Sequence, residues 1–361
     1  MTLYDRLADL PLVVESESRT RRERDTSSGF SRVTTVVSLS GAGETGRGED
    51  VTYDAADHEA LAGAPALAPT GDGFDGDTFD EFSAHLDDVD LFPAGPPERE
   101  SSRHYRRWAY ESAALDLALR QADTDLAAAL GRERDPVRFV ASTRLDAVEE
   151  GTDDDGPPSA DRVHALLARN PDLELKLDPT SDWTDDLVAE LAATDAVRVL
   201  DLKGQYSGTT VDQDPDPTLY ERVVDGFPDA VVEDPALTDD TEPVVDRARD
   251  RASWDAPITG VASVEALPFP PRWLNVKPSR FGTVASLLDC IEYAEDRDVA
   301  LYGGGQFELD VGREHVQALA SVFYPDGPND VAPGVYNDPE VAGDLPRSPL
   351  VPSDEARGLS L

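Results

Sequence analysis

The sequence predicts an α/β protein in which a parallel (β/α) barrel follows a smaller α+β domain. Two observations support this prediction. From residue 137 onward, short apolar runs of strand length alternate with stretches of helix length. The 361 residues also suit a large barrel with a second domain better than one compact core. Strands and helices that alternate in this way form a parallel sheet with helices covering it.

Residues 1–132 are predicted to form the separate, loop-rich α+β domain. The run RVTTVVSL at 32–39 is typical of a strand. GETGRGEDV at 43–51 predicts a turn that leads into another short extended segment. The Pro-, Gly- and Asp-rich residues 63–76 predict a loop.

Two helices are expected at the end of this domain. Residues 77–91 have an amphipathic helical pattern. The Ala- and Leu-rich residues 105–130 predict a long helix, with Gly131 where a helix ends. We expect this long helix to pack against the barrel that follows.

The barrel is predicted over residues 133–335, with an irregular tail at 336–361. Its strand candidates are 137–142, 173–177, 197–202, 230–232, 258–262, 273–277, 299–302 and 330–332. Helix candidates include 158–169, 184–194, 239–252, 283–297 and 311–323. Eight buried strands with helices between them predict a closed parallel barrel. A doubly wound open sheet is the alternative, although no G-x-G-x-x-G motif follows the first strand.

The composition is strongly acidic, with 74 Asp and Glu against 32 Lys and Arg and a formal net charge of −42. Such a surface repels nucleic acids and anionic membranes, so we expect neither as a partner. An acidic coat of this kind is typical of proteins from halophiles, which work in concentrated salt. The charge therefore indicates where the protein works and not what it does.

The sequence also limits the protein's location. It contains no apolar run long enough for a membrane span, and its N-terminus lacks the order of a secretion signal. The single cysteine, Cys290, excludes an internal disulfide framework and is expected to be a small core residue. We expect a cytoplasmic protein, and a homo-oligomer is left open.

Lysine is almost absent from the chain, which contains only Lys176, Lys203 and Lys277. All three fall at the ends of predicted strands. In parallel barrels, functional residues lie at these carboxyl ends. Unlike arginine, a shielded lysine can lose its proton, so three such lysines suggest proton transfer. The alternative is structural: buried lysines paired with Asp201 and Glu233 as ion pairs.

Other polar residues also follow predicted strands and are candidates for one site at this rim. They are Glu174, Asp201, Glu233, Asp234, Asn275, Gln306 and Glu308. The run at 303–305 consists of three glycines, which either let the backbone approach a ligand or form a tight turn.

Several of these motifs resemble the enolase superfamily, in particular its mandelate racemase and muconate lactonising branch. GRGED at 46–50 is similar to the family's G-x-G-E turn, and the helix before Gly131 to its domain-linking helix. LELKL, LDLKG, VVEDP and LNVKPSRFG resemble the second-, third-, fourth- and sixth-strand segments in order. The resemblance implies a modified (β/α)7β barrel with an N-terminal α+β capping domain.

The same resemblance implies roles for individual residues. Lys176 and Lys277 match the two opposed lysines that transfer protons, and Asp201 and Glu233 match two ligands of Mg²⁺. The family expects a third carboxylate on the fifth strand, where the predicted strand offers only Ser263 or Glu265. Two further departures are Glu174 in place of the first lysine of K-x-K, and Lys203 in place of an asparagine.

The implied reaction is removal of a proton next to a carboxylate, with the enolate stabilised by Mg²⁺. It leads to racemisation, epimerisation, cycloisomerisation or β-elimination of a small carboxylate such as an acid sugar, a cyclic carboxylate or a dipeptide. The residues expected to bind substrate are Lys203, Asn275, Gly304, Gln306 and Glu308. Two alternatives remain: a lyase or aldolase in which Lys277 forms a Schiff base, and a non-catalytic barrel that has lost its metal site.

Overall fold

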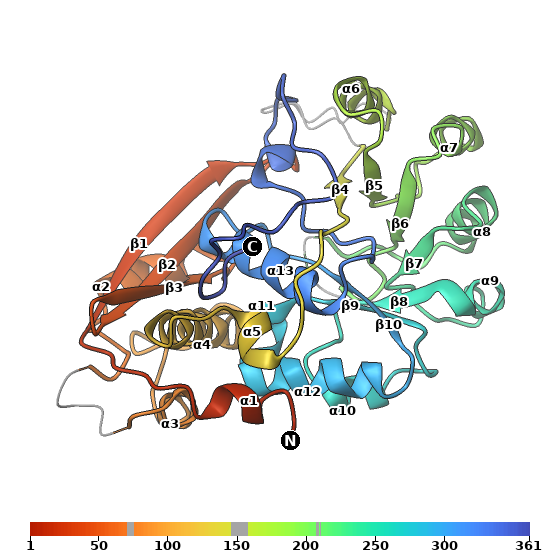
Figure 1. Ribbon diagram of the computed structural model, residues 1–361. Coiled ribbons are helices and arrows are strands. Elements are labelled where there is room, and N and C mark those ends of the chain that lie inside the picture. The colour runs from red at the N-terminus through yellow and green to blue at the C-terminus, as the bar shows by residue number, and fades with distance from the viewer. Residues whose placement is uncertain (71–75, 146–157, 207–208, 210) are drawn as a thin grey trace.

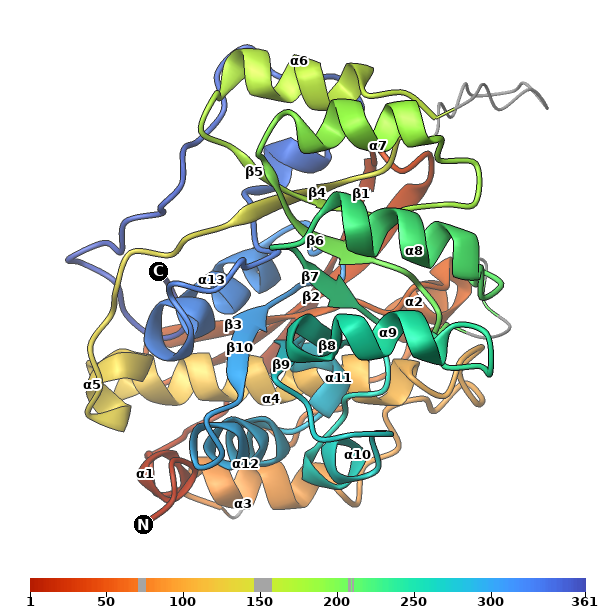
Figure 2. The ribbon, with the colours of Figure 1, turned by 90° about the vertical axis from the view of Figure 1, so that its right-hand side faces the viewer.

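The computed structural model describes residues 1–70, 76–145, 158–206, 209 and 211–361. A three-stranded antiparallel sheet occupies the N-terminal region, and a seven-stranded parallel sheet curls through the rest. Figures 1 and 2 show α6, α7, α8 and α9 outside the curled sheet, with the N-terminal sheet on the other side of the molecule. The predicted fold class, a (β/α) barrel with an α+β capping domain, is confirmed.

The capping domain is built around the antiparallel sheet in the order β1-β2-β3. Its elements are α1 (Asp5–Ala8), β1 (Ser16–Asp25), β2 (Ser31–Gly41), β3 (Glu44–Asp50), α2 (Ala55–Gly63), α3 (Phe79–Leu86), α4 (Ser102–Gln121) and α5 (Leu126–Leu130). The predicted loop at 63–76 falls partly on residues 71–75, which lie outside the described residues.

Strand β3 packs directly on the backbone of α4. A Cβ at Gly46 would lie 2.3 Å from the Ala113 carbonyl oxygen, and one at Gly48 would lie 2.0 Å from the Ala109 carbonyl oxygen. Only glycine permits so close an approach. The segment GRGED therefore belongs to a strand, and its interpretation as a turn is wrong.

The barrel elements follow in the expected alternation. They are β4 (Val140–Thr143), α6 (Asp161–Arg169), β5 (Glu174–Leu177), α7 (Asp185–Ala192), β6 (Val197–Asp201), α8 (Pro217–Gly226), β7 (Val231–Glu233), α9 (Glu242–Arg247), η2 (Arg249–Arg251), β8 (Ala252–Trp254), α10 (Val261–Glu265), β9 (Trp273–Val276), α11 (Pro278–Phe281), α12 (Val284–Glu295), β10 (Ala300–Gly303), α13 (Val311–Phe323) and η3 (Gly334–Asn337). The strands are parallel in the order β10-β9-β8-β7-β6-β5-β4.

Two predicted barrel strands are wrong. The fifth is β8, only three residues long, and it begins where the predicted helix 239–252 ends. The apolar run at 258–262 instead leads into α10. The eighth candidate, 330–332, is not a strand: Asn329 and Asp330 make single parallel bridges to Phe139 and Gly304. These two residues connect the edges of the curled sheet.

Two further differences concern the capping domain. Strand β1 was not predicted because its sequence, SESRTRRERD, contains no apolar residue. The long helix predicted at 105–130 is divided into α4 and α5, with Asp123 in the left-handed region at φ 51° between them. An α-helix cannot continue through that conformation.

Buried polar contacts join the capping domain to the barrel. The carboxylate of Glu49 in β3 accepts hydrogen bonds from the backbone N–H groups of Leu309 (2.7 Å), Asp310 (3.0 Å) and Gly312 (2.9 Å) at the start of α13. The Arg32 guanidinium, 1% exposed, donates to the carbonyl oxygen of Gln306 at 3.0 Å. The loop after β10 is therefore held by the N-terminal sheet.

No helix among the described residues is both long and apolar enough to cross a bilayer.

Candidate functional site

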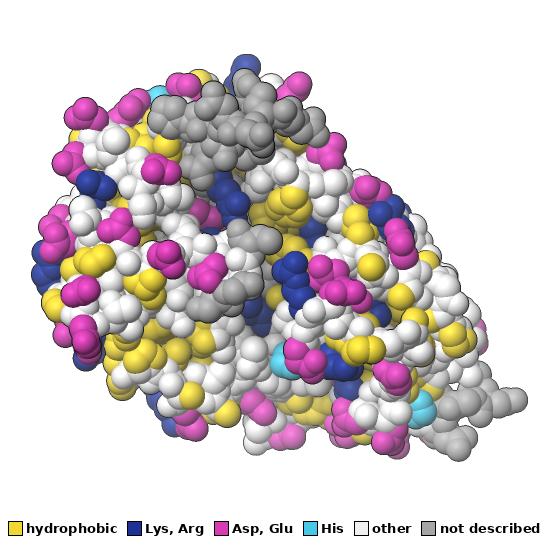
Figure 3. All heavy atoms as spheres, turned by 180° about the vertical axis from the view of Figure 1, so that it is seen from behind, with side chains coloured by type: hydrophobic (Ala, Val, Ile, Leu, Met, Phe, Trp, Pro, Cys, Tyr) yellow, Lys and Arg dark blue, Asp and Glu magenta, His cyan; other side chains and the backbone are white. Residues whose placement is uncertain are grey.

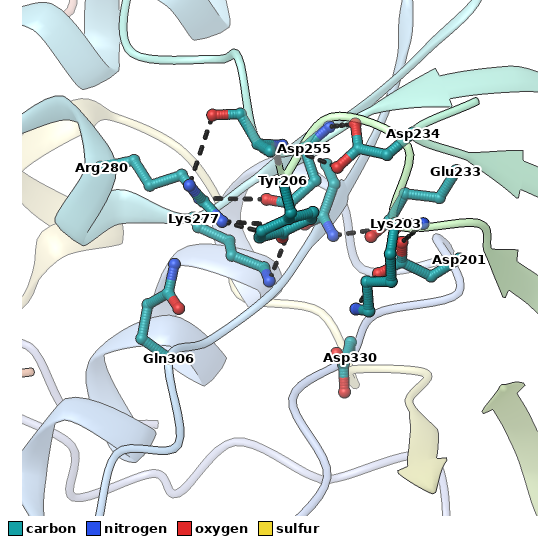
Figure 4. A network of polar contacts seen from close by, with 12 residues as sticks. Asp201, Lys203, Tyr206, Glu233, Asp234, Asp255, Lys277, Arg280, Gln306 and Asp330 are labelled. Atoms are coloured by element: carbon teal, nitrogen blue, oxygen red, sulfur yellow. Dashed lines mark hydrogen bonds and ion pairs between the residues drawn. The ribbon is translucent and has the colours of Figure 1, made fainter. Parts of the chain in front are cut away.

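Three carboxylates lie together at the ends of neighbouring strands. Asp201 ends β6, Glu233 ends β7, and Asp255 directly follows β8. One oxygen of each lies within 4.8 Å of the others, and all three side chains are 0% exposed. We call Asp201, Glu233 and Asp255 the triad (Figure 4). Because their strands are adjacent and parallel, their carboxyl ends meet at one edge of the sheet.

The third carboxylate corrects the sequence analysis. Neither Ser263 nor Glu265 belongs to the triad, since both lie in α10. The Ser263 hydroxyl donates to the Gly260 carbonyl oxygen at 2.7 Å, and Glu265 lines a different cavity. Asp255 was missed because its strand is so short. A signal was present nonetheless: SWDAP and VVEDP both place an acidic residue directly after an apolar one and two positions before proline.

Lysines from strands on both sides contact the triad. Lys176 of β5, 1% exposed, forms an ion pair with Glu233 and lies 3.2 Å from Asp201 Oδ2 and 3.8 Å from Asp330 Oδ2. Lys277, which follows β9, lies 2.9 Å from Asp255 Oδ2. The structure thus brings two of the predicted lysines to opposite sides of one carboxylate cluster.

Lys203 is the third lysine and lies two residues beyond β6. Its ammonium group is 2.5 Å from Asp201 Oδ2 and 3.4 Å from Asp178 Oδ2. Its backbone is left-handed at φ 54°, an uncommon conformation for a residue with a side chain. The backbone N–H also donates to Asp201 Oδ1 at 3.1 Å, which holds this turn against the triad.

These contacts set the protonation of the lysines. Burial alone would lower the pKa of Lys176, but Glu233, Asp201 and Asp330 outweigh it and raise the pKa well above its usual value. Against the same burial effect, Asp255 raises the pKa of Lys277. Our expectation that an unpaired, buried ammonium group loses its proton more easily does not apply, because these lysines are paired.

Two of the three triad carboxylates respond in the opposite direction. Burial favours the neutral acid, yet Lys203 and Lys176 hold the pKa of Asp201 below its ordinary range. Arg280 and Lys277 likewise hold the pKa of Asp255 low against burial. Burial instead raises the pKa of Glu233 well above its usual value, although Lys176 opposes this effect. Asp201 and Asp255 therefore keep anionic oxygen atoms inside the protein.

Asp255 is positioned by Asp234, which the sequence analysis named as a site candidate, and by Tyr206 and Arg280, which it did not name. Asp234 accepts hydrogen bonds from the backbone N–H groups of Asp255 (2.8 Å) and Ala256 (2.9 Å). The Tyr206 hydroxyl donates to Asp255 Oδ2 at 2.7 Å, and Arg280 Nε lies 3.2 Å from Asp255 Oδ1. Burial, reinforced by Asp255, raises the pKa of Asp234 to about 7.

A cavity of about 640 Å³ opens above the triad between the barrel and the capping domain. Among the predicted site residues, Lys176, Lys203, Lys277 and Gln306 line it. Phe30, Tyr53, Arg99 and Tyr105 line it from the capping domain. Figure 3 shows Lys and Arg side chains in a hollow near the centre of the face seen from behind.

Asn275 and Gly304 lie beneath this cavity. Asn275 is 1% exposed and donates to Glu233 Oε2 at 3.1 Å. A Cβ at Gly304 would lie 2.6 Å from Asn275 Oδ1 and 2.8 Å from Lys277 Cε. This glycine therefore makes room for two site side chains, and its role in substrate binding stays a prediction, as does that of Asn275.

Two glutamates lie away from the triad. Glu308 lines a neighbouring cavity of about 600 Å³ and forms an ion pair of 3.1 Å with Arg313. Glu174 begins β5, at the opposite end of the strand from Leu177, and pairs with Arg138 and Arg198. Its grouping with the residues at the carboxyl-terminal rim is wrong.

Asp178 is a cavity residue that the sequence analysis overlooked. It follows Lys176 by two residues, and its Oδ2 lies 3.4 Å from both Lys203 Nζ and Arg144 Nε. Its Oδ1 is buried and has no hydrogen-bond partner among the described residues. The spacing of two after Lys176 was a usable signal, because alternate strand positions share a face.

Solved structures of the enolase superfamily have the same fold. A dipeptide epimerase from Enterococcus faecalis V583 is 16% identical, with a TM-score of 0.66 over 97% of this chain and 99% of that one. An enolase superfamily member of unknown function from the same organism is 16% identical, with a TM-score of 0.63 over 97% and 94%. Muconate cycloisomerase from Pseudomonas fluorescens is 17% identical, with a TM-score of 0.62 over 89% and 87%.

At these identities the similarity establishes the fold. No curated protein matches the sequence. Residues 5–129 match the family description "Domain of unknown function (DUF8230) N-terminal domain", and residues 133–338 match its C-terminal counterpart. Together the two matches cover most of the chain, which therefore belongs to the DUF8230 family.

Proposed function

We propose that this protein is an enzyme that removes a proton α to the carboxylate of a small molecule, with Mg²⁺ held by the triad. The observation that carries this proposal is the completed triad between two lysines. In the sheet, β9 and β5 border the three triad strands on either side. Lys277 and Lys176 therefore approach from opposite directions, as needed when a proton leaves one face of a carbon and returns to the other.

The donor set fits Mg²⁺. This ion prefers carboxylate oxygens and keeps several coordination positions for water and substrate. Asp201, Glu233 and Asp255 offer three buried carboxylates, and Asp255 Oδ1 accepts no hydrogen bond from any residue that the structure describes. The bound ion supplies the positive charge that stabilises the enolate oxygen.

We assign proton transfer to Lys176 and Lys277. A Mg²⁺ ion at the triad would offset the negative charge that raises the pKa of both lysines. Their burial would then lower the pKa of each lysine toward the range of a working base. Lys203 is assigned to the substrate carboxylate, because its ammonium group lines the cavity beside the triad. This division explains why the chain keeps three lysines in one place.

The site favours this reaction over the two alternatives. A Schiff-base lyase needs no divalent ion, so it leaves the three buried carboxylates beside Lys277 without a role. A barrel without its metal site would be expected to lack the carboxylates, and all three are present. Two of the similar structures are an epimerase and a cycloisomerase, which supports an isomerase.

The test combines metal binding with isotope exchange. Calorimetry on protein stripped with EDTA should show binding of Mg²⁺. Incubation with a panel of carboxylates in D₂O should then give Mg²⁺-dependent loss of an α-proton signal in the NMR spectrum. Asp255→Asn should weaken Mg²⁺ binding by at least the 10- to 100-fold typical of a lost supporting contact, because it removes a ligand itself.

Glu265→Gln is the matched control, since Glu265 lies on α10 outside the triad. It should bind Mg²⁺ like the unaltered protein. Equal weakening in both variants, or exchange that EDTA leaves unchanged, would refute the proposal.

A further inference from the structure

The cavity reverses the charge balance of the chain. Acidic residues outnumber basic ones by 74 to 32 overall. Among the described residues, the cavity wall carries seven cations and two acids. The cations are Arg99, Arg144, Lys176, Lys203, Lys277, Arg280 and Arg313, and the acids are Asp178 and Asp330. A wall of this kind selects anions from solution.

The carboxylates that pair with these cations balance them. Seven form ion pairs with the wall: Asp54, Asp178, Asp201, Glu233, Asp255, Glu308 and Asp330. Seven cations thus face seven carboxylates before any ion or substrate binds. A divalent cation at the triad, whose three side chains are fully buried, adds two positive charges inside the protein. An uncompensated charge there is costly, so a ligand with two negative charges fits better than one with a single charge.

The wall also offers hydrogen-bond donors that have no partner. Gln306 is 3% exposed, and its side-chain Nε2 makes no hydrogen bond within the part of the chain that the structure describes. Arg313 Nε likewise makes no hydrogen bond to any described residue, although Arg313 Nη2 lies 3.1 Å from Glu308 Oε2. Buried donors normally have acceptors, so both indicate a ligand.

Gln306 is held firmly by its surroundings. Its backbone N–H donates to Glu308 Oε1 at 2.6 Å, and its carbonyl oxygen accepts from Arg32 at 3.0 Å. Its side-chain Oε1 accepts from the Tyr53 hydroxyl at 2.8 Å. Figure 4 shows the Gln306 side chain directed toward the side of the network that holds Lys277. We call Tyr53, Gln306 and Arg313 the cap-facing wall.

We propose that the substrate carries two acidic groups, one at the triad and the second at the cap-facing wall, where Gln306 and Arg313 donate to it. This inference rests on the proposed function, because the first acidic group binds beside the metal ion. It narrows the substrate class from small carboxylates to dianionic ones. The aromatic rings of Phe30, Tyr53 and Phe307 line the same cavity and offer apolar surface to the part of the ligand that joins the two groups.

Calorimetry with simple probes tests this proposal without a known substrate. Each of succinate, glutarate and adipate is titrated into the protein with Mg²⁺, beside the monocarboxylate of equal chain length. At least one dicarboxylate should bind ten times more tightly than its monocarboxylate partner. Gln306→Leu should remove most of this preference while it leaves monocarboxylate binding unchanged.

Gln205→Leu is the matched control. Gln205 lines the same cavity, but its Nε2 already donates to the Pro235 carbonyl oxygen at 2.7 Å. The dicarboxylate preference should survive in this variant. Equal affinities for both probe classes in the unaltered protein, loss of the preference in both variants, or its survival in Gln306→Leu would each overturn the inference.

The outcomes also separate this inference from the proposed function. A dicarboxylate preference that persists unchanged in EDTA would contradict the metal-dependent function and keep the second acidic subsite. Mg²⁺-dependent binding of dicarboxylates and monocarboxylates with equal affinity would support the metal-dependent function and contradict the second acidic subsite. Failure of every probe to bind would refute both.

Discussion

The triad and the cap-facing wall are built in different ways. Each triad residue lies at or directly after the end of a strand, and its carboxylate pairs with a lysine or arginine on β5 or in the segment that follows β9. The cap-facing wall joins residues from the capping domain, the loop after β10 and the start of α13, and it leaves donors without partners. This contrast suggests that the triad side fixes the chemistry and the cap-facing wall selects the ligand.

The largest effect is expected on the triad side. Lys277→Arg keeps the positive charge beside Asp255 but removes a base, because arginine does not give up its proton near neutral pH. Turnover should fall by roughly 10² or more, the usual contribution of general base catalysis. Ligand affinity should change much less. The measurement is deuterium incorporation at the α-carbon of a substrate found by the exchange screen.

Two further exchanges of lysine for arginine sharpen this result. Lys176→Arg should be equally severe for a racemisation or epimerisation, whereas an elimination that uses one base needs only one of the two lysines. Lys203→Arg should alter KM more than kcat. If both Lys277→Arg and Lys176→Arg exchange the α-proton at the normal rate, the lysines are structural ion pairs and the contrast between the two regions fails.

The triad could be predicted from the sequence more fully than the cap-facing wall, because two of its three residues end recognisable strands. Lys176, Asp201, Glu233 and Lys277 were found because apolar runs mark strands and polar residues mark their ends. Asp255 was missed because β8 is three residues long and the adjacent residues have a helical pattern. A strand that short carries too little periodicity to be recognised.

The cap-facing wall could not be predicted from short sequence patterns. Gln306 was named as a candidate, but its orientation depends on Tyr53 and Arg32, more than 250 residues earlier in the chain. Arg313 was part of a predicted helix and had no distinguishing feature. Such contacts depend on how the capping domain packs on the barrel, which no short sequence motif records.

The next largest effect is expected where the two regions meet. Gly304→Ala would place a Cβ 2.6 Å from Asn275 Oδ1 and 2.8 Å from Lys277 Cε. Overpacking of this kind typically costs about 1–3 kcal/mol of stability. Urea unfolding should show the loss, and exchange activity should fall with it. Gly343→Ala is the control, because a Cβ there meets nothing within 4 Å. Equal stability of the two variants would contradict this prediction, because the loop after β10 would then move to accommodate the added methyl group without cost.

A smaller effect concerns α13, which carries Arg313. Burial lowers the pKa of His315 on this helix to about 4, against the opposing effect of Asp116. Since the folded protein binds the proton less readily than the unfolded chain, this histidine destabilises the fold as pH falls below about 6.5. The destabilisation grows until the pH reaches about 4. At pH 5 it should amount to about 2 kcal/mol.

Urea unfolding at pH 7 and pH 5 measures this effect. His315→Gln should reduce the loss of stability between the two pH values, whereas the same change at the exposed His164 should not. If the free energy of unfolding depends on pH identically in His315→Gln and in the unaltered protein, His315 is not the cause of the loss of stability.

Salt should affect the stability of variants in the two regions equally. The net charge of −42 should destabilise the fold at low ionic strength, so Tm should rise from dilute buffer to molar KCl. Because this repulsion acts over the surface, Asp255→Asn and Gln306→Leu should respond alike. A flat or falling Tm would contradict our proposal that the acidic composition is an adaptation to concentrated salt.

The contacts of Glu49 and Arg32 have a consequence for how the molecule opens. A swing of the capping domain away from the barrel would strip Glu49 of its backbone donors on α13 and Arg32 of the Gln306 carbonyl oxygen. Hydrogen bonds to charged groups typically contribute about 1.5–3 kcal/mol each, so the fraction of molecules with a detached capping domain is small. Ligands must then enter and leave through local movements of the cavity wall. Heating should melt both domains in a single cooperative calorimetric transition.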